Sequence, residues 1–380
     1  MAASTVQSAQ ALNALLELVR ELNTRFLGPE FGNERPEDVT KGRLYLLQSL
    51  LSALDSQIGA DPDRPVFHRI VAPNKKVLGD NPDAIYFGAY IRPDRAYRVR
   101  GNIAGAVFTS FSQELGTADG HYSKGTVNVV KDTQLQVDPD GNYEFVLAPE
   151  RRPGNWFPLH PEAGLINTRH FFEEEKPVAA DPNKRIPLTI EPLDPPGPSA
   201  PLSDAAVATT ICRVMNYMRG MTLENPPTAS GPQPNWISTV PNQFNPPADP
   251  PAGMGWANMD AVYAMAPYEL QPDQALIIDG RFPKCRFSSV MLYNRYLQTF
   301  DFVNRRVSLN RKQTTLEPDG SFRMVLAHRD PGVPNWIDTD GHVRGRLFWR
   351  FLLPEERVQP LRTRVVPVAD VAKLWATRPT

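Results

Sequence analysis

The chain has 380 residues, which is enough for two or three domains with a sizeable core. Its 41 basic and 42 acidic residues nearly cancel, which argues against a general electrostatic attraction to nucleic acid or to an anionic membrane. No run approaches the roughly 20 apolar residues that span a bilayer. The two cysteines, Cys212 and Cys285, form neither a disulfide framework nor a metal-ligand spacing. We therefore expect a cytoplasmic protein that binds neither nucleic acid nor a membrane.

Residues 1–62 have the periodicity of amphipathic helices. Apolar residues recur every three or four positions in two stretches: Leu12, Leu15, Val19, Leu22 and Phe26, and then Leu44, Leu47, Leu51 and Leu54. The second stretch follows Asp38 to Thr40, which supplies a capping side chain for a helix start. The N-terminus also lacks the basic region of a signal peptide. We expect this helical segment to cap or brace the next domain or, alternatively, to bind a partner.

From about residue 80 the apolar residues recur at every second position instead of at every third or fourth. Short alternating runs such as Tyr97–Val99 and Tyr143–Leu147 are separated by Gly, Asp and Pro. Residues 137–142 (VDPDGN) have the composition of a hairpin turn, because Pro presets φ and Gly accepts a positive φ. Many short strands divided by turns are typical of antiparallel sheets. We assign residues 63–176 to a first jelly-roll-like β-sandwich.

Residues 177–254 form a proline-rich linker with one predicted helix. Prolines concentrate in residues 177–201 and 226–251, and Ser203 begins the helical pattern between them. Proline-rich chain is extended and semi-rigid, so it can wrap across a surface. The second stretch is interrupted by the apolar residues Trp236, Ile237 and Phe244. We expect this stretch to pack against a sandwich and to roof a cavity.

Residues 255–380 repeat the pattern of the first sandwich. Residues 96–108 align without a gap on residues 275–287, and Asp140-Gly141 aligns on Asp319-Gly320 at the same offset. A chain that repeats itself in this way contains one fold twice. The predicted fold class is therefore mainly β, with a helical N-terminal segment and two tandem antiparallel jelly-roll-like β-sandwiches.

The second copy resembles an uncharacterised bacterial family, domain of unknown function 1214. The resemblance depends on the motif Asn258-x-Asp260-Ala261-x-Tyr263, on Leu292-Tyr293-Asn294, on residues 330–339 (DPGVPNWIDT) and on residues 350–354 (RFLLP). It covers roughly residues 258–366, and the first copy fits more loosely. The resemblance implies a jelly-roll-like β-sandwich, often in tandem with a related domain, and implies no established activity.

The sequence contains none of the GxSxG, GxxxxGK, HExxH or strand-associated GxGxxG signatures. The Asn-x-Asp-Ala-x-Tyr motif instead offers a carboxylate and a phenol in each copy: Asp83 with Tyr86, and Asp260 with Tyr263. Such a pair can hydrogen-bond a substrate and move a proton. The alternative is structural, because Asn and Asp side chains also fix turns by accepting backbone N–H groups.

An Asn-Trp pair follows a Pro/Gly turn in each copy, at Asn155-Trp156 and Asn335-Trp336. Trp offers a flat face for a sugar or ring, and Asn offers a donor and an acceptor, so we list these four residues as candidate substrate-binding groups. The alternative is that Trp seals the end of the sandwich while Asn holds the turn.

Histidines differ between the copies and are candidate acid/base groups. His170 lies beside Arg169 on a strand predicted to face inward, and His342 lies four residues after Asp338. We name His170 and His342 as the better catalytic candidates. No short spacing brings three ligands together, so we predict no metal site.

Arg169 and Arg350 occupy matching positions in predicted strands, where a buried charge needs a partner. They can clamp a substrate carboxylate or sulfate, or form structural ion pairs with Asp83 and Asp260. The structural ion pair is the interpretation we favour.

These residues leave three function classes. We favour a cofactor-independent enzyme that acts on a small, partly apolar organic substrate by acid/base chemistry, in a pocket where the two repeats meet. The alternatives are a non-catalytic carbohydrate- or lipid-binding protein and a structural or assembly protein. The expected partner is a small-molecule ligand. A homo-oligomer stays open as well, because exposed sheet edges and helix pairs favour contacts between copies.

Overall fold

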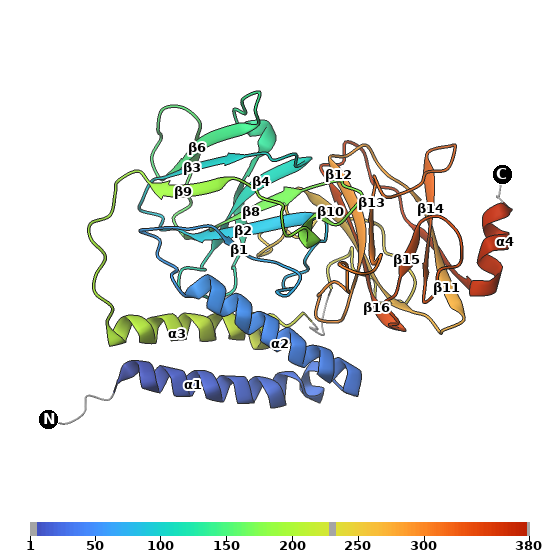
Figure 1. The fold of residues 1–380 in the computed structure, drawn as a ribbon, viewed down its shortest axis with the longest axis horizontal. Helices are drawn as coiled ribbons and strands as arrows, with labels where there is room; N and C mark the ends of the chain where they lie inside the picture. The colour runs from blue at the N-terminus through green and yellow to red at the C-terminus, as the bar shows by residue number, and fades with distance from the viewer. Residues whose placement is uncertain (1–5, 228–232, 378–380) are drawn as a thin grey trace.

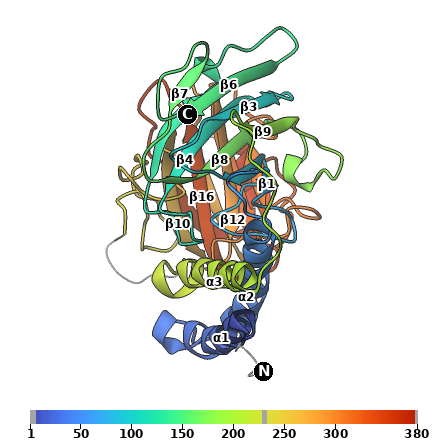
Figure 2. The ribbon, with the colours of Figure 1, turned by 90° about the vertical axis from the view of Figure 1, so that its left-hand side faces the viewer.

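The computed structural model describes residues 6–227 and 233–377. The three longer helices lie together along one side of the molecule, and the short C-terminal helix lies at the far end of the second of two β-rich halves (Figures 1 and 2). Helix α1 (Gln7–Glu21) continues into a π-helical turn (Leu22–Phe26), and a short 3-10 turn (Pro29–Phe31) precedes α2 (Pro36–Gln57). Helix α3 (Asp204–Arg219) begins where predicted, because the Ser203 side chain accepts the Ala206 N–H. Within the described residues, no helix is long and apolar enough to cross a lipid bilayer.

The leucine stripe of α2 faces away from the rest of the chain. Leu47 is 66% exposed and Leu51 is 42% exposed, so these residues contribute little to the brace that the sequence predicted. The buried face of α2 is largely polar: the Tyr45 hydroxyl donates to the Met221 carbonyl at 2.7 Å, and Ser52 shares a hydrogen bond with Tyr217 at 2.9 Å. Leu46 and Leu50 also pack against buried apolar residues beneath the helix. Helix α2 is therefore attached through apolar contacts as well as hydrogen bonds.

The first copy contains two sheets. One has the order β1 (His68–Arg69), β2 (Ala84–Tyr90), β8 (Ala163–Phe171), β4 (Phe108–Leu115) and β5 (Thr126–Lys131). The other has the order β7 (Trp156–Pro158), β6 (Asn142–Ala148), β3 (Tyr97–Asn102) and β9 (Leu188–Pro192). Strand β9 thus completes the first copy from within the stretch that follows residue 176.

The second copy repeats this strand order. One sheet runs β10 (Ala261–Glu269), β16 (Arg344–Leu352), β12 (Phe287–Tyr293) and β13 (Ser308–Asn310). The other runs β15 (Trp336–Asp338), β14 (Ser321–Ala327), β11 (Gln274–Arg281) and β17 (Arg362–Pro367), and α4 (Val371–Ala376) packs on it. Apart from β1, each strand of one copy has a counterpart at the same sheet position in the other. The duplication seen in the sequence is therefore a duplication of fold.

The sheets are not wholly antiparallel. In each copy one short pair is parallel: β6 with β7, and β14 with β15. The predicted Asp-Gly turns are present, and Gly141 and Gly320 both adopt a positive φ, at 86° and 81°. Here glycine is needed because a side chain would strain this backbone conformation.

Three large apolar cores stabilise the chain. Each copy has its own core, built from the facing sides of its two sheets: Phe111 and Phe145 belong to the first, Trp349 and Phe322 to the second. The third core lies between the copies and extends under the helices. The rings of Phe171 and Phe287 meet there, with centroids 5.0 Å apart.

The proline-rich chain before the second copy covers the edge of β10. Met265 N–H donates to the Trp236 carbonyl at 2.9 Å, and Tyr263 N–H donates to the Ala248 carbonyl at 2.9 Å. Proline offers no N–H for pairing, so the bonds are made by the non-proline residues between. The covering segment, residues 233–258, thereby protects an edge strand and anchors Trp236, as the sequence predicted.

Asp83 lies buried where the two copies touch. Its Oδ1 accepts the Asn310 amide of the second copy at 3.0 Å, while Oδ2 has no hydrogen-bond partner among the described residues. Burial raises the pKa of Asp83 from 3.8 to about 7, despite the bond from Asn310. The folded chain therefore retains a proton that the unfolded chain has lost.

This raised pKa predicts a pH-dependent stability. Because the folded chain binds the extra proton between pH 4 and pH 7, the free energy of unfolding should fall as the pH rises through that window. The loss attributable to Asp83 should be at most about 4 kcal/mol. Urea unfolding at pH 5 and pH 8 should show a smaller loss for Asp83→Asn than for the wild type. Equal losses in both proteins would show that Asp83 does not hold the extra proton.

Candidate functional site

A cavity of about 550 Å³ lies between the two copies, beneath the covering segment and beside α2. Strands β2 and β8 line it from the first copy, and β10 and β16 line it from the second. Much of its wall is aromatic, including Tyr45, Phe171, Trp236, Tyr263 and Phe348. This size and lining are typical of sites for small organic molecules. The cavity is also where the sequence predicted a site, between the repeats and beneath the proline-rich chain.

The alternation of strand side chains decides which residues reach the cavity. On β16, Leu347, Trp349 and Phe351 point into the core of the second copy. The intervening residues Arg346, Phe348 and Arg350 line the cavity. On β8, Asn167 and Arg169 line the cavity, whereas Ile166 belongs to the core of the first copy. Each copy therefore presents an arginine to the space between the copies.

Arg350 is buried and holds groups from both copies. Its guanidinium donates to the Tyr86 hydroxyl at 3.2 Å, to the Tyr293 hydroxyl at 3.1 Å and to the Gly79 carbonyl. Its Nε has no acceptor among the described residues, and no carboxylate there lies within 4.0 Å of the guanidinium. The predicted ion pair with Asp83 or Asp260 is therefore wrong for Arg350.

Arg169 has a carboxylate partner, but a different one from that predicted. It donates to the Ser112 hydroxyl at 2.6 Å and to the Ala257 carbonyl at 3.1 Å, and Glu114 lies 3.7 Å away. Glu114 is fully buried and also accepts the hydroxyls of Ser123 and Thr126. The prediction failed because Arg169 lies across from Tyr86 near the end of β8, whereas the aspartates before β2 and β10 have other partners. Asp83 accepts the Asn310 amide, and Asp260 pairs with Lys131.

Tyr86 and Tyr263 line the cavity from matching positions. Each lies directly across from the arginine of its own copy: Tyr86 from Arg169, and Tyr263 from Arg350. The Tyr263 hydroxyl is bonded to the Asn258 backbone, whereas the Tyr86 hydroxyl accepts Arg350. Burial raises the pKa of Tyr86 above its usual value, so Tyr86 is a neutral phenol at physiological pH.

The Asn and Asp residues of the repeated motif shape its turn. Asn81 Oδ1 accepts the Asp83 N–H at 2.9 Å, and Asn258 Oδ1 accepts the Asp260 N–H at 3.1 Å. Asp260 forms an ion pair with Lys131 at 2.7 Å. Neither aspartate lines the cavity, so the structural alternative describes both of them. Asn258 does line it, and its Nδ2 has no acceptor among the residues that the structure describes.

The two favoured histidines lie away from the cavity. His170 alternates with Arg169 and so points into the first copy, where its ring lies 6.2 Å from that of Phe111. Burial lowers the pKa of His170 to about 3, so the imidazole is neutral. His342 packs 4.3 Å from the ring of Phe300. Among the described residues, no three His, Cys, Asp or Glu side chains cluster closely enough to hold a metal ion.

The Asn-Trp pairs hold the ends of the sheets. Trp156 Nε1 donates to the Ala148 carbonyl at 3.2 Å, and Trp336 Nε1 donates to the Ala327 carbonyl at 3.0 Å. Asn155 donates to the Glu144 carbonyl, and Asn335 to the Thr315 and Arg323 carbonyls. None of the four lines the cavity, and their contacts match the structural alternative.

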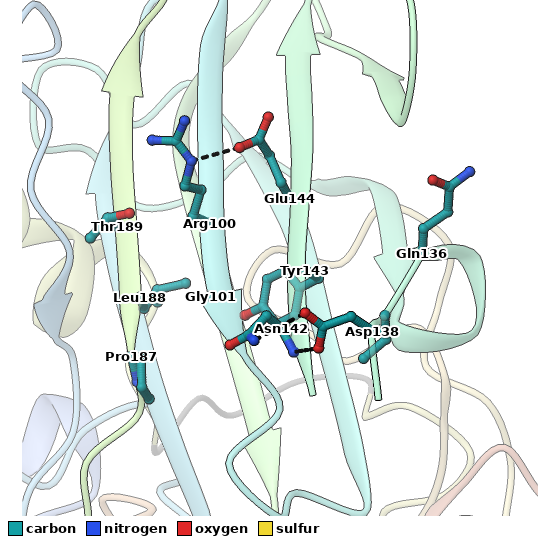
Figure 3. Close-up of a pocket in the computed structure, with 11 residues that line it drawn as sticks. Arg100, Gly101, Gln136, Asp138, Asn142, Tyr143, Glu144, Pro187, Leu188 and Thr189 are labelled. Carbon is teal, nitrogen blue, oxygen red and sulfur yellow. Dashed lines mark hydrogen bonds and ion pairs between the residues drawn. The ribbon is translucent and has the colours of Figure 1, made fainter. Parts of the chain in front are cut away.

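A second hollow lies at the ends of β3, β6 and β9 (Figure 3). Its charged groups are exposed and already have partners, since Arg100 pairs with Glu144 at 2.6 Å and with nearby Glu191 at 2.9 Å, and Asp138 accepts the Asn142 amide at 3.1 Å. An exposed, paired surface of this kind offers a ligand little desolvated contact. The cavity between the copies is therefore the candidate site.

Sequence reasoning missed several polar residues of this site, among them Asp80, Asn167 and Arg346. A signal existed for Arg346, which lies four residues before Arg350 and so shares its face of the strand. Asp80 and Asn167 carried no comparable signal. Asp80 accepts the backbone and side chain of Thr299 from the other copy, a contact that only tertiary folding creates.

Comparison with known proteins bears on family and fold. Residues 266–356 match the family described as "Protein of unknown function (DUF1214)". The crystal structure of an uncharacterised protein from Burkholderia cenocepacia is similar over 96% of this chain and 99% of that one, with a TM-score of 0.82 and 25% identity. The VPA0106 protein from Vibrio parahaemolyticus is similar over 85% of this chain and 98% of its own, with a TM-score of 0.50 and 11% identity, which shows likeness of fold alone. No curated protein matches the chain. The predicted resemblance of the second copy to the DUF1214 family is therefore confirmed.

Proposed function

We propose that the protein binds a small, partly apolar organic molecule in the cavity between its two copies. The observation that carries the proposal is the lining of this cavity, which joins an aromatic wall to Arg346 and Arg350. Neither arginine has a carboxylate within 4.0 Å among the described residues. A concave, largely apolar space with a few convergent polar groups is typical of a site for a small organic molecule.

The aromatic wall supports the apolar part of this proposal. Trp236 stacks on Phe348 with their ring centroids 5.5 Å apart, and Tyr263 packs against both rings. Apolar surface on a ligand would gain roughly 25 cal/mol for each Å² buried there. The proposal also includes a cytoplasmic location and independence from a cofactor, and the residue pattern supports both. It further includes a jelly-roll-like form for each sandwich, which is supported by the core that the two sheets of each copy share.

Acid/base catalysis on the bound molecule is the second candidate function, and the observation that favours it is Tyr86. Because its hydroxyl oxygen accepts Arg350, its own proton is available to a ligand. The adjacent guanidinium would stabilise a phenolate after proton transfer. We assign Tyr86 the role of general acid in this candidate, because His170, His342, Asp83 and Asp260 lie away from the cavity.

A ligand screen tests both candidates. Partly apolar molecules with acceptor groups should raise the melting temperature of the wild type, and mass spectrometry of the best hit should reveal any product. Tyr86→Phe should weaken binding by about tenfold, the effect of one hydrogen bond of about 1.4 kcal/mol, and should abolish any turnover.

Tyr143→Phe is the matched control, because Tyr143 is another buried tyrosine whose hydroxyl has no partner among the described residues, in the core of the first copy. It should leave binding unchanged. Binding without product would exclude catalysis for that ligand class. A screen in which no ligand stabilises the wild type, or in which Tyr143→Phe weakens binding as much as Tyr86→Phe, would contradict a site in this cavity.

A further inference from the structure

The cavity carries a surplus of buried positive charge. Three arginines line it, and only Arg169 has a carboxylate near its guanidinium, that of Glu114 at 3.7 Å. Arg346 and Arg350 have no ion-pair partner within the described part of the chain.

Of the two acids that line the same cavity, Asp80 lies near Arg350 and offsets part of its charge, while both of its carboxylate oxygens also accept hydrogen bonds from Thr299. Among the described residues, no carboxylate lies within 4.0 Å of the Arg346 guanidinium. Glu224 is exposed, so water screens its carboxylate. The interior of the cavity is therefore suited to an anion.

Arg346 is the less engaged of the two unpaired arginines. Among the described residues its guanidinium makes one bond, to the Pro227 carbonyl at 3.3 Å. Burial, and then the nearby charge of Arg295, lowers the pKa of Arg346 to about 10. Arg346 nevertheless stays charged at neutral pH. A partly desolvated charge without a counter-ion is costly, and an anion would reduce that cost.

The neighbours of Arg346 define the rest of the ligand. Phe348 follows on the same face of β16, with Trp236 stacked on it, and Arg350 lies beyond Phe348. An anionic group at Arg346 would therefore continue directly onto an aromatic surface. The arginine fork matches a planar carboxylate, which it can bind with two parallel hydrogen bonds.

We propose that the ligand of this cavity is an organic monocarboxylate with an apolar body, and that Arg346 pairs with its carboxylate. This inference rests on the proposed function and names the chemical class of its ligand. The apolar body lies on Phe348 and Trp236.

The test compares carboxylates with their own neutral amides. Octanoate and 4-phenylbutyrate, each with its primary amide, are titrated into the full-length chain by calorimetry. The carboxylates should bind at least about tenfold more tightly than the amides. Arg346→Gln should lower carboxylate affinity by about 10- to 100-fold and leave amide affinity unchanged, because a hydrogen bond to a charged group is worth more than a neutral one.

Arg344→Gln is the matched control, since Arg344 lies on the same strand, is exposed and pairs with Glu269. It should bind like the wild type. Equal affinity for carboxylates and amides would overturn the anionic class and leave the proposed function standing. Failure of all four probes would overturn the anionic class, while the broader screen still decides the proposed function. Because Arg346 is half-buried with one bond, Arg346→Gln should fold, and circular dichroism confirms this.

An independent observation concerns the exposed stripe of α2. Leu44, Leu47, Leu51, Leu54 and Ile58 are all at least 36% exposed. Their spacing of three and four residues is that of the core positions of a coiled coil. The opposite face of α2 is buried by the body of the protein, so the stripe points straight outward.

We infer that α2 of a second copy packs antiparallel on this stripe and forms a two-fold symmetric dimer. If Leu47 lies level with Leu51 of the other copy, then Leu44 lies level with the other Leu54, and Arg43 with the other Asp55. A parallel pairing would instead place Arg43 beside Arg43 and Asp55 beside Asp55. Asp55 already pairs with Lys75 of its own chain, and its second carboxylate oxygen can still face Arg43 of the other copy. Charge therefore favours the antiparallel arrangement, in which the same surface serves both copies.

Charge substitution in the stripe tests the dimer and its direction. Light scattering after size-exclusion chromatography should give a dimeric mass for the wild type and a monomeric mass for Leu47→Glu. Combining Leu47→Glu with Leu51→Lys should restore the dimer in part. Only in the antiparallel arrangement does the new carboxylate at position 47 face the new ammonium group at position 51 of the other copy.

Leu202→Glu, at a residue 85% exposed outside the stripe, is the control and should remain dimeric. A monomeric wild type at high micromolar concentration would overturn the dimer. A dimer that survives Leu47→Glu would show that the contact lies elsewhere. A double variant that stays monomeric would overturn the antiparallel direction.

Discussion

Everything in the candidate site depends on two sheets that pack outer face to outer face. Strands β8 and β16 lie in the middle of those sheets, so both faces of each strand are covered. One face meets the core of its own copy, and the other meets the second copy. Because side chains alternate along a strand, the arginines must then enter a buried space between the copies. A buried arginine needs hydrogen-bond or ion-pair partners. The chain supplies only some of these partners to the arginines that line the cavity.

The two copies meet this demand differently. In the first copy, Arg169 is balanced by Glu114 and by carbonyls of the covering segment. In the second copy, Arg350 meets phenols and a carbonyl, and Arg346 meets a single carbonyl. One copy thus holds a self-contained charge pair while the other leaves positive charge exposed to the cavity.

The large features of the fold could be predicted because local chemistry sets them. The Asp-Gly turns, the Ser203 helix start and the period of two in the strands all follow from neighbouring residues. The cavity between the repeats could also be anticipated, since duplicated domains must meet somewhere and Trp236 was too apolar to be exposed. Tyr86, Tyr263, Arg169 and Arg350 were named from the sequence and do line it. Their partners could not be named, because Gly79, Glu114 and Tyr293 come from distant parts of the chain.

The sequence by itself determined a duplicated, mainly β chain and the positions of its helices and turns. It also determined that alternate residues of each strand point to opposite faces of the sheet. What tertiary structure alone decided is which side of each strand is the functional side. His170 and Arg169 are neighbours on one strand, and the sequence treated both as members of one site. Packing separates them, because a strand sends adjacent side chains to opposite faces, and the packing of the second copy decides which face borders the cavity. Packing also decides which face of α2 is buried. Its exposed leucine stripe has the periodicity of a core yet faces outward, because the opposite face packs against the third core through Leu46 and Leu50 and makes hydrogen bonds through Tyr45 and Ser52.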